Sequence, residues 1–330
     1  MKQYFKINQI EYVLGSQKLN SFELGKEFIT NDNPKEKINL FIENVIGKDT
    51  VYRLSEKDNL IDMAVQVVKK AIDKAKINKI DAIICTNVVG EYYTPTTALV
   101  ILDKAGLNKD VRFATDMNTN CTGMITALYT INSMMGVDDS INNVLVVDMM
   151  TLSHFKSPID LLANVGFSDA VTAMVVSRRD VPLEMEFMGY QDTTFINTVM
   201  GPANGMVNLA NDKDINKLPM NCKTPPRVPI EKAVEITNLF LDKHNLQPSD
   251  IKHNCFSQVV KSAIYELSNQ VGFKEDTVEY IGDKLGYTGP SSPILALKNR
   301  IDRGLVKDGD QIFVWAISTG VQFVFCLFKY

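Results

Sequence analysis

The sequence has few of the side chains that most metal and redox sites require: its 330 residues include three histidines, five cysteines and one tryptophan. The cysteines are odd in number, widely spaced and nowhere arranged as Cys-x-x-Cys, which argues against a zinc site or a disulfide framework and favours reduced thiols in a cytoplasmic protein. So few histidines also argue against a histidine-based metal site, and we expect no metal. The short motifs of dinucleotide-binding proteins, P-loop proteins, α/β-hydrolases and zinc proteases are absent from the sequence as well.

A strong charge of either sign is also lacking. The 35 basic and 39 acidic residues leave a net charge of −4, which argues against nucleic acid or a lipid surface as a partner. The N-terminus has no continuous apolar segment of the kind that a secretory signal needs. The uncharged stretch of residues 312–328 is interrupted by Ser318, Thr319 and Gly320, which is typical of two buried strands joined by a tight turn rather than of a membrane span.

The chain repeats part of itself. Residues 72–81 end a helical pattern and lead into an apolar run, and residues 241–250 do the same at a constant offset of 169. Residues 105–110 match residues 271–276 at an offset of 166, and holding that offset aligns Cys121 with Tyr287. A helix, a glycine cap and a strand often follow one another by chance. Two ordered matches with nearly equal offsets nevertheless favour a duplication.

Each half alternates apolar runs with amphipathic helical patterns, which predicts an α/β fold of sheets covered by helices. The predicted strands are residues 81–86, 143–148, 170–177, 311–317 and 322–328. The predicted helices are residues 60–75, 121–135, 230–244, 258–271 and 293–303. Residues 197–228 are richer in Asn, Pro, Gly and Lys, which predicts a surface excursion before the second half.

Cys121 is the cysteine whose surroundings indicate chemistry. It opens a predicted helix after Thr119 and Asn120, which are residue types that cap helices. The positive end of the helix dipole is expected to lower the pKa of the thiol and favour the thiolate. Most lone cysteines are inert core residues, and that description fits the cysteines within the predicted strands, namely Cys85, Cys255 and Cys326. From these residues alone, both a nucleophile and an inert thiol remain open for Cys121.

A set of motifs resembles the β-ketoacyl-acyl-carrier-protein synthase III family of the thiolase-fold superfamily, over nearly the whole chain. The motifs lie at residues 93–98, 118–128, 166–170 and 285–292, followed by a final strand–glycine–strand. The resemblance implies an α/β thiolase fold of duplicated halves in a five-layered α-β-α-β-α sandwich, usually an isologous dimer. The N-terminal half would be residues 1–170 with Cys121, and the C-terminal half residues 171–330 with Ser257, Tyr287 and Gly320.

The sequence departs from this family at two of its three catalytic positions. In the family the cysteine takes an acyl group as a thioester, and a histidine and an asparagine then help to decarboxylate a malonyl thioester. The resemblance places Ser257 at the histidine position and Tyr287 at the asparagine position. The hydroxyl of Ser257 is neither a cationic donor nor a base near pH 7, and Tyr287 donates one hydrogen bond but fills space that the malonyl group needs. We therefore expect no ordinary decarboxylating elongation.

The same register implies substrate-binding positions. Thr94 would face the acyl group, where relatives often carry a larger side chain, and Phe41 and His154 would face the donor at the mouth of its tunnel. The family has an arginine in place of His154, so its loss shifts the expected donor from coenzyme A toward the phosphopantetheine thioester of an acyl carrier protein. Lys261 would meet an acidic carrier, although exposed lysines usually serve only solubility.

Two functions are consistent with these residues. The first is an acyltransferase or atypical condensing enzyme of specialised metabolism, which forms an acyl thioester on Cys121 and passes it to a small-molecule or carrier-bound acceptor. The backbone N–H groups of Cys121 and Gly320 match the family's oxyanion hole, no permanently bound cofactor is expected, and the enzyme would be a homodimer. The alternative is a catalytically silent subunit that supports an active homologue in a heterodimer, with Tyr287 as an aromatic plug. Retention of Cys121 favours the first function.

Overall fold

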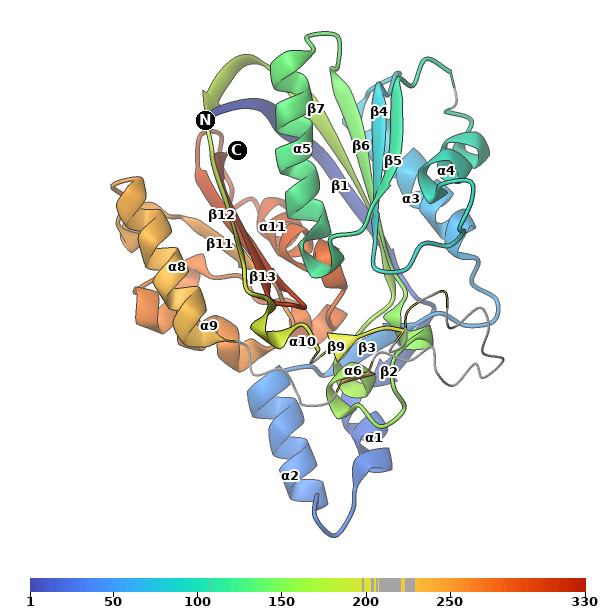
Figure 1. The fold of residues 1–330 in the computed structure, drawn as a ribbon, viewed down its shortest axis with the longest axis vertical. Helices are drawn as coiled ribbons and strands as arrows, with labels where there is room; N and C mark the ends of the chain where they lie inside the picture. The colour runs from blue at the N-terminus through green and yellow to red at the C-terminus, as the bar shows by residue number, and fades with distance from the viewer. Residues whose placement is uncertain (108, 198, 203–204, 206, 208–220, 223–228) are drawn as a thin grey trace.

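The computed structural model describes residues 1–330 except 108, 198, 203–204, 206, 208–220 and 223–228. Two β-sheets form its framework (Figure 1). The first has the order β1-β7-β6-β4-β5, with β1 (Lys2–Leu14), β4 (Ala82–Asn87), β5 (Phe113–Met117), β6 (Asn143–Met150) and β7 (Ala170–Glu184). The second has the order β11-β12-β13-β8, with β8 (Glu186–Gln191), β11 (His253–Phe256), β12 (Gln311–Ser318) and β13 (Gln322–Lys329).

Helices cover both faces of each sheet. Three hydrophobic cores result: one between the outer helices and the first sheet, one around the central helices between the sheets, and one between the second sheet and its outer helices. The layers are visible edge-on in Figure 1, and they confirm the predicted α-β-α-β-α sandwich. The outer helices of the first sheet are α3 (Leu60–Ala75) and α4 (Thr97–Ala105), the central helices are α5 (Gly123–Val137) and α11 (Ser292–Asp302), and the outer helices of the second sheet are α8 (Ile230–Lys243) and α9 (Lys261–Val271).

Local sequence explains why outer and central helices differ. The Asn59 side chain caps α3 by accepting a hydrogen bond from the Asp62 N–H, and apolar residues at helical spacing form the single buried face of this helix. By contrast, α5 lies between the sheets and carries no acidic or basic residue from Gly123 to Val137. A helix that is apolar on most sides belongs in the interior, so this composition places the helix after Cys121 at the centre of the sandwich.

The two sheets have the same arrangement of strands. The parallel pair β4–β6 corresponds to β11–β12, and the antiparallel neighbours β6–β7–β1 correspond to β12–β13–β8. One detail of the predicted repeat is wrong. The short turn η3 (Asn120–Thr122) corresponds to η9 (Gly289–Ser291), at an offset of 169 rather than 166. Cys121 therefore corresponds to Pro290, and Tyr287 lies three residues earlier.

The predicted strands and helices are present, and most of their ends lie within two residues of the prediction. The first sheet includes all of β7 (Ala170–Glu184), so it extends past the expected division between residues 170 and 171. The helix predicted for residues 258–271 begins only at Lys261, because the buried side chain of Gln258 bonds to a neighbouring segment instead. Residues 197–228 lie largely outside the described residues. Their described part includes the two-residue strands β9 (Val199–Met200) and β10 (Asn221–Cys222), which pair with each other.

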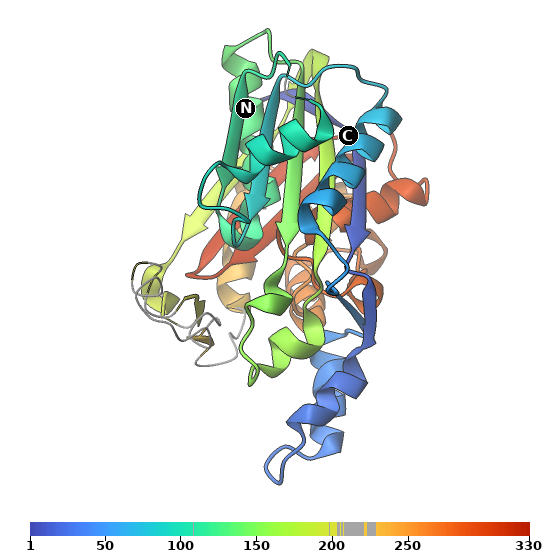
Figure 2. The same cartoon turned by 90° about the vertical axis from the view of Figure 1, so that its right-hand side faces the viewer.

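The remaining segments cluster at one end of the sandwich and extend beyond it (Figures 1 and 2). A separate apolar core, built around Ile42, Ile46 and Val165, holds them together. No helix in the described ranges is long and apolar enough to span a membrane. These elements are β2 (Gln17–Asn20), α1 (Ser21–Gly25), η1 (Lys26–Phe28), α2 (Lys35–Leu40), η2 (Phe41–Ile46), β3 (Thr50–Arg53), η4 (Leu152–His154), α6 (Leu161–Gly166) and α10 (Gly282–Leu285).

Candidate functional site

Cys121 lies in η3, the turn that leads into the central helix α5. Cys121 is free and partly exposed as a residue, although its thiol is turned inward, whereas Cys85, Cys255 and Cys326 are free and fully buried in strands. Thr122 fixes the turn, since its hydroxyl donates to the Thr119 carbonyl at 2.7 Å and lies 3.3 Å from the Gln322 Oε1 at the start of β13. The only accessible cysteine among these four therefore sits where the two halves meet.

Ser257, Tyr287 and Cys121 lie next to one another. The Ser257 hydroxyl donates to the Tyr287 hydroxyl at 3.5 Å, which is a long bond, and the Tyr287 hydroxyl is near enough to the Cys121 thiol to lower its pKa. Ser257 and Tyr287 are both buried, at 3% and 1% exposure. The structure thus brings together the three residues that the sequence nominated as catalytic.

The backbone and one aromatic neighbour hold Tyr287 in place. Its N–H donates to the Gly166 carbonyl at 2.8 Å, and its own carbonyl accepts from the Ser168 N–H at 2.9 Å. The Phe167 ring packs edge-on against the Tyr287 ring with centroids 5.2 Å apart. Gly286 has φ of 68°, and a Cβ atom there would collide with the Ser168 side chain. The motif at residues 166–170 therefore fixes the position of Tyr287.

The pKa of the Cys121 thiol differs from the expectation. Burial raises it above its usual range, and the Asp148 carboxylate adds to that effect. The hydrogen bond from Tyr287 lowers it in part. The prediction of a thiol pKa lowered by the helix terminus is wrong, because removal of the thiol from water outweighs the favourable contacts. Burial also raises the pKa of Tyr287 well above its usual range, so this side chain stays a phenol that donates.

A buried lysine supports the segment that carries Ser257. The Lys48 ammonium donates to the Gln258 carbonyl at 2.5 Å and to the Tyr280 hydroxyl at 2.7 Å, and the lysine is fully buried. The Tyr280 hydroxyl donates in turn to the Gly47 carbonyl at 2.8 Å. Burial lowers the pKa of Lys48 to about 7. Lys48 therefore ties the N-terminal half to the turn that follows Ser257.

Sequence reasoning missed Lys48 and also Asp148, a fully buried acid on β6. The Thr86 hydroxyl donates to Asp148 Oδ1 at 2.8 Å, and burial raises the pKa of Asp148 to about 7. A signal was present, because Asp148 is the only charged residue in the apolar strand from Asn143 to Met150. No comparable signal marked Lys48, which sits in a polar connection whose burial depends on contacts more than 200 residues away in sequence.

The other nominated residues lie around this centre without a described contact to it. Gly320 lies in the turn between β12 and β13, and β12 packs against η3. Thr94 is exposed in the loop before α4, and His154 is exposed at the end of η4. Phe41 is half-buried in the same apolar core as Phe167, which itself touches Tyr287. Their roles in an oxyanion hole or in substrate binding stay predictions.

No histidine approaches Cys121 among the described contacts. His253 is buried at the start of β11, where its Nδ1 accepts from the Arg300 guanidinium at 2.7 Å and its Nε2 donates to the Asp310 carboxylate at 3.2 Å. His244 caps the end of α8 and lies 3.7 Å from a carboxylate oxygen of Glu186. The site therefore lacks an imidazole that might serve as a base or a cationic donor.

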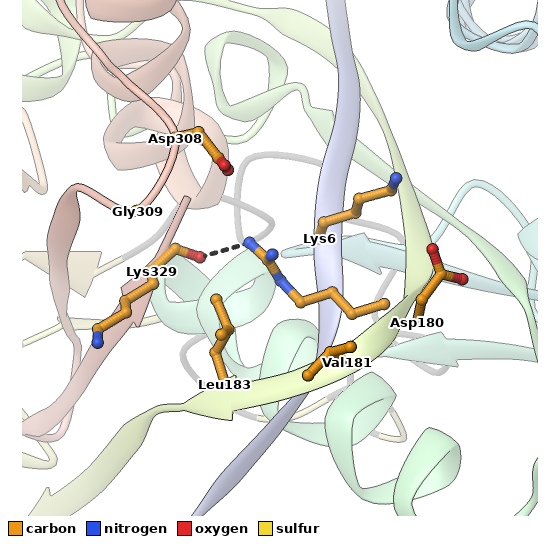
Figure 3. Close-up of a pocket in the computed structure, with 8 residues that line it drawn as sticks. Lys6, Asp180, Val181, Leu183, Asp308, Gly309 and Lys329 are labelled. Carbon is orange, nitrogen blue, oxygen red and sulfur yellow. Dashed lines mark hydrogen bonds between the residues drawn. The ribbon is translucent and has the colours of Figure 1, made fainter.

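A surface hollow of about 480 Å³ lies at the far end of β7 from Cys121, between β1, β7 and the turn at Gly309 (Figure 3). One cationic side chain that lines it already has hydrogen-bond partners: the Arg179 guanidinium donates to the carbonyls of Phe5 and Lys329, both at 2.9 Å. Asp180 and Asp308 balance the remaining charge of Lys6 and Lys329. This hollow does not contribute to the Cys121 site.

Comparisons with known proteins agree with this arrangement. The family model for 3-oxoacyl-[acyl-carrier-protein (ACP)] synthase III matches residues 115–191, and the model for the C-terminal part of the same family matches residues 241–330. The chain is 24% identical over 336 residues to the β-ketoacyl-[acyl-carrier-protein] synthase III of Sulfurovum sp. (strain NBC37-1), covering 99% of this chain and 96% of the relative.

Solved structures show the same fold. The 3-oxoacyl-[acyl-carrier-protein] synthase III from Aquifex aeolicus VF5 superposes with a TM-score of 0.84 at 22% identity, covering 99% of this chain and 100% of that one. The priming β-ketosynthase from the R1128 polyketide biosynthetic pathway superposes with a TM-score of 0.86 at 17% identity, covering 99% and 96%. The thiolase fold is thus shown, and the two matched segments contain Cys121, Ser257, Tyr287 and Gly320. The chain belongs to the 3-oxoacyl-[acyl-carrier-protein] synthase III family.

Proposed function

We propose that this protein is an acyltransferase or atypical condensing enzyme of specialised metabolism that works through an acyl thioester on Cys121. The observation that carries the proposal is the position of the Tyr287 hydroxyl, which is bonded to Ser257 and lowers the pKa of the Cys121 thiol. Tyr287 thus favours the thiolate of the one cysteine that is partly exposed among the four whose burial is described. An inert core cysteine needs no such partner.

The two half-reactions balance without a cofactor. The Cys121 sulfur attacks the carbonyl carbon of an acyl thioester, the donor's carbon–sulfur bond breaks, and the thiol proton ends on the departing phosphopantetheine or coenzyme A thiol. The acceptor then attacks the carbonyl carbon of the acyl-enzyme, the carbon–sulfur bond to Cys121 breaks, and Cys121 leaves as a thiolate that Tyr287 stabilises until it takes up the acceptor's proton. The backbone N–H groups of Cys121 and Gly320 would carry the negative charge on the carbonyl oxygen in both steps.

Decarboxylation of a malonyl group is poorly supported by these residues. Its enolate oxygen needs two preorganised donors, and loss of one typically lowers the rate about 10²–10³-fold. The Ser257 hydroxyl donates to Tyr287, so it is not free to hold an enolate. Only the Tyr287 hydroxyl is left as a donor, and its buried ring fills space beside Cys121.

Two surface features support the proposed acyl donor and the proposed dimer. Lys261 begins α9 and lies over the Tyr280 ring at 5.7 Å, so it offers a cation to an acidic acyl carrier protein beside the Ser257 turn. The edge strand β5 exposes 43% of Phe113, and the loop between β4 and α4 exposes 88% of Tyr93. An unpaired strand edge bordered by exposed aromatic side chains is consistent with a dimer across β5.

The second candidate function is a catalytically silent subunit of a heterodimer. One observation favours it: Tyr287 is almost completely buried against Phe167 and fills the space beside Cys121. In that case Cys121 would carry no acyl group, and activity would appear only with a homologous partner chain.

Intact-protein mass spectrometry separates the two functions. The purified chain and the Cys121→Ala variant are incubated with a panel of acyl-coenzyme A and acyl-carrier-protein thioesters. We expect an acyl adduct that is lost in Cys121→Ala, and the added mass identifies the acyl group. No adduct with any donor would contradict the acyltransferase, and activity that appears only with a co-purifying homologue would establish the silent subunit.

A further inference from the structure

Three polar side chains lie next to one another on the first sheet, beneath the start of α5. Thr86 on β4 pairs with Asp148 on β6, and Asp148 pairs with Thr172 on β7. Directly paired residues on adjacent strands project to the same face, and all three residues are fully buried. A Cβ atom placed on Gly123, the first residue of α5, would lie 3.0 Å from the Thr86 Cβ. The row therefore lies directly behind the start of α5, next to the turn that holds Cys121.

The carboxyl group in this row has fewer partners than an ionised carboxylate needs. The Thr86 hydroxyl satisfies Asp148 Oδ1, whereas Asp148 Oδ2 and the Thr172 hydroxyl oxygen have no hydrogen-bond partner among the described residues. Burying an unpaired charge is costly, which favours the neutral acid. When Asp148 is protonated on Oδ2, that O–H group can donate a hydrogen bond to the Thr172 hydroxyl oxygen opposite it.

The surroundings of Asp148 are uncharged except for weakly acidic groups. Burial raises the pKa of Asp148, and the Thr86 and Ser291 groups oppose that effect only in part. The ionised form in turn raises the pKa of the Cys121 thiol. The groups that face Asp148 from its neighbouring elements are Thr86 of β4, Thr172 of β7, Ser291 of η9, Cys121 of η3, and Tyr287, while Cys85 of β4 lies nearby on the opposite face of the sheet.

We propose that Asp148 is a positioning residue for the Cys121 nucleophile: as the neutral acid it lets Cys121 ionise, and as the carboxylate it keeps Cys121 protonated. The residue acts through the electric field of its charge and touches no substrate. The inference rests on the proposed role of Cys121 as the nucleophile. It adds that the reactivity of this thiol is suppressed as Asp148 loses its proton near neutral pH.

The test is the pH dependence of alkylation by iodoacetamide, followed by intact mass, for the wild-type chain and Asp148→Asn. Asparagine keeps the shape of the acid and cannot ionise. At an effective dielectric constant of about 20, a unit charge within about 10 Å changes a thiol pKa by about one unit. We therefore expect the Cys121 pKa to fall by about one unit in Asp148→Asn, with about tenfold faster alkylation near pH 8. Cys121→Ala provides the background from the other cysteines.

Asp116→Asn is the matched control. Asp116 lies on the neighbouring strand β5, where it accepts from the Thr97 and Ala98 N–H groups, and it does not act on the pKa of Cys121. We expect this variant to leave the Cys121 pKa unchanged. An equal or higher thiol pKa in folded Asp148→Asn would overturn the proposal.

A second variant keeps the test decisive should Asp148→Asn fail to fold. Thr86→Val removes a donor that lowers the pKa of Asp148, so Asp148 stays neutral to higher pH. Alkylation is then expected to be faster than wild type at pH 8 and equal at pH 10, and no difference at pH 8 would overturn the proposal. Alkylation needs no acyl donor, so a missing acyl adduct and a missing effect of Asp148 are separate results.

Discussion

Replacing Tyr287 by phenylalanine tests the hydrogen bond on which the proposed acyltransferase depends. The variant keeps the ring against Phe167 and removes the hydroxyl between Ser257 and Cys121. A hydrogen bond to a charged group contributes about 1.5–3 kcal/mol. Since about 1.4 kcal/mol corresponds to one pKa unit, loss of this donor is expected to raise the thiol pKa by about one to two units.

The direction follows from which state the hydroxyl stabilises. Tyr287 donates to sulfur, and the thiolate accepts a hydrogen bond better than the thiol does. Burial already raises the pKa of Cys121 and Tyr287 opposes it, so nothing in the variant replaces the lost effect. Near pH 8 the thiolate fraction, and with it the rate of acyl-enzyme formation, is expected to fall about 10- to 100-fold.

The assay is iodoacetamide alkylation of Cys121 between pH 6 and pH 10, with acyl-enzyme formation measured on the same samples. Tyr265→Phe is the control, because Tyr265 is a half-buried tyrosine of α9 that does not act on the Cys121 pKa. An unchanged or lower thiol pKa in folded Tyr287→Phe would refute the reasoning. Tyr287 would then be a plug, and the silent subunit would become the better description.

Two further predictions concern stability. Burial lowers the pKa of Lys48 to about 7 from its usual 10.5, so the unfolded chain binds one more proton between these values. Stability is therefore expected to rise with pH from about 7 to 10.5, by up to about 1.4 kcal/mol per pH unit from this group, and Lys48→Met should remove that slope in urea unfolding measured at pH 7 and pH 9. Equal slopes in both chains would contradict the burial of a titrating ammonium. Gly286→Ala should cost about 2 kcal/mol or more, because φ of 68° is combined with a collision against Ser168, whereas the control Gly106→Ala, with φ of 74° and open space, should cost about 1 kcal/mol. Equal midpoints of unfolding for the two alanine variants would show that Ser168 does not constrain the turn.

Much of the fold was predictable because its signals are local. Alternating apolar runs and amphipathic helices indicated two covered sheets, and the repeated helix–glycine–strand pattern indicated the duplication. The repeat failed where it depended on an ungapped count: Cys121 corresponds to Pro290, because three residues separate the two offsets. Insertions of a few residues in a loop leave a helical pattern intact while shifting every later residue, so local pattern alone does not fix such a register.

The candidate site was predictable in its members but not in its electrostatics. The resemblance nominated Cys121, Ser257 and Tyr287, and the structure places them next to one another. The sign of the pKa change on Cys121 depends on how much water the folded chain removes, which no single segment specifies. The burial of Lys48 and its lowered pKa were likewise not predictable from local sequence, because its partner Gln258 is 210 residues away in sequence.

The protonation of the two hydroxyl groups constrains the acceptor of the acyl group. Ser257 donates to Tyr287, and burial raises the pKa of Tyr287 well above its usual range, so neither hydroxyl can remove a proton from an incoming nucleophile near neutral pH. An alcohol must lose its proton as it attacks a thioester and needs a base to do so. His253 is not available for this task, since Arg300 and Asp310 occupy both of its ring nitrogens. A thiol that ionises near neutral pH or an unprotonated amine attacks without such help, and exchange between a thioester and a thiol passes one proton from the incoming thiol to the departing one. The described residues therefore support transfer of an acyl group between two thiols more completely than transfer to an alcohol.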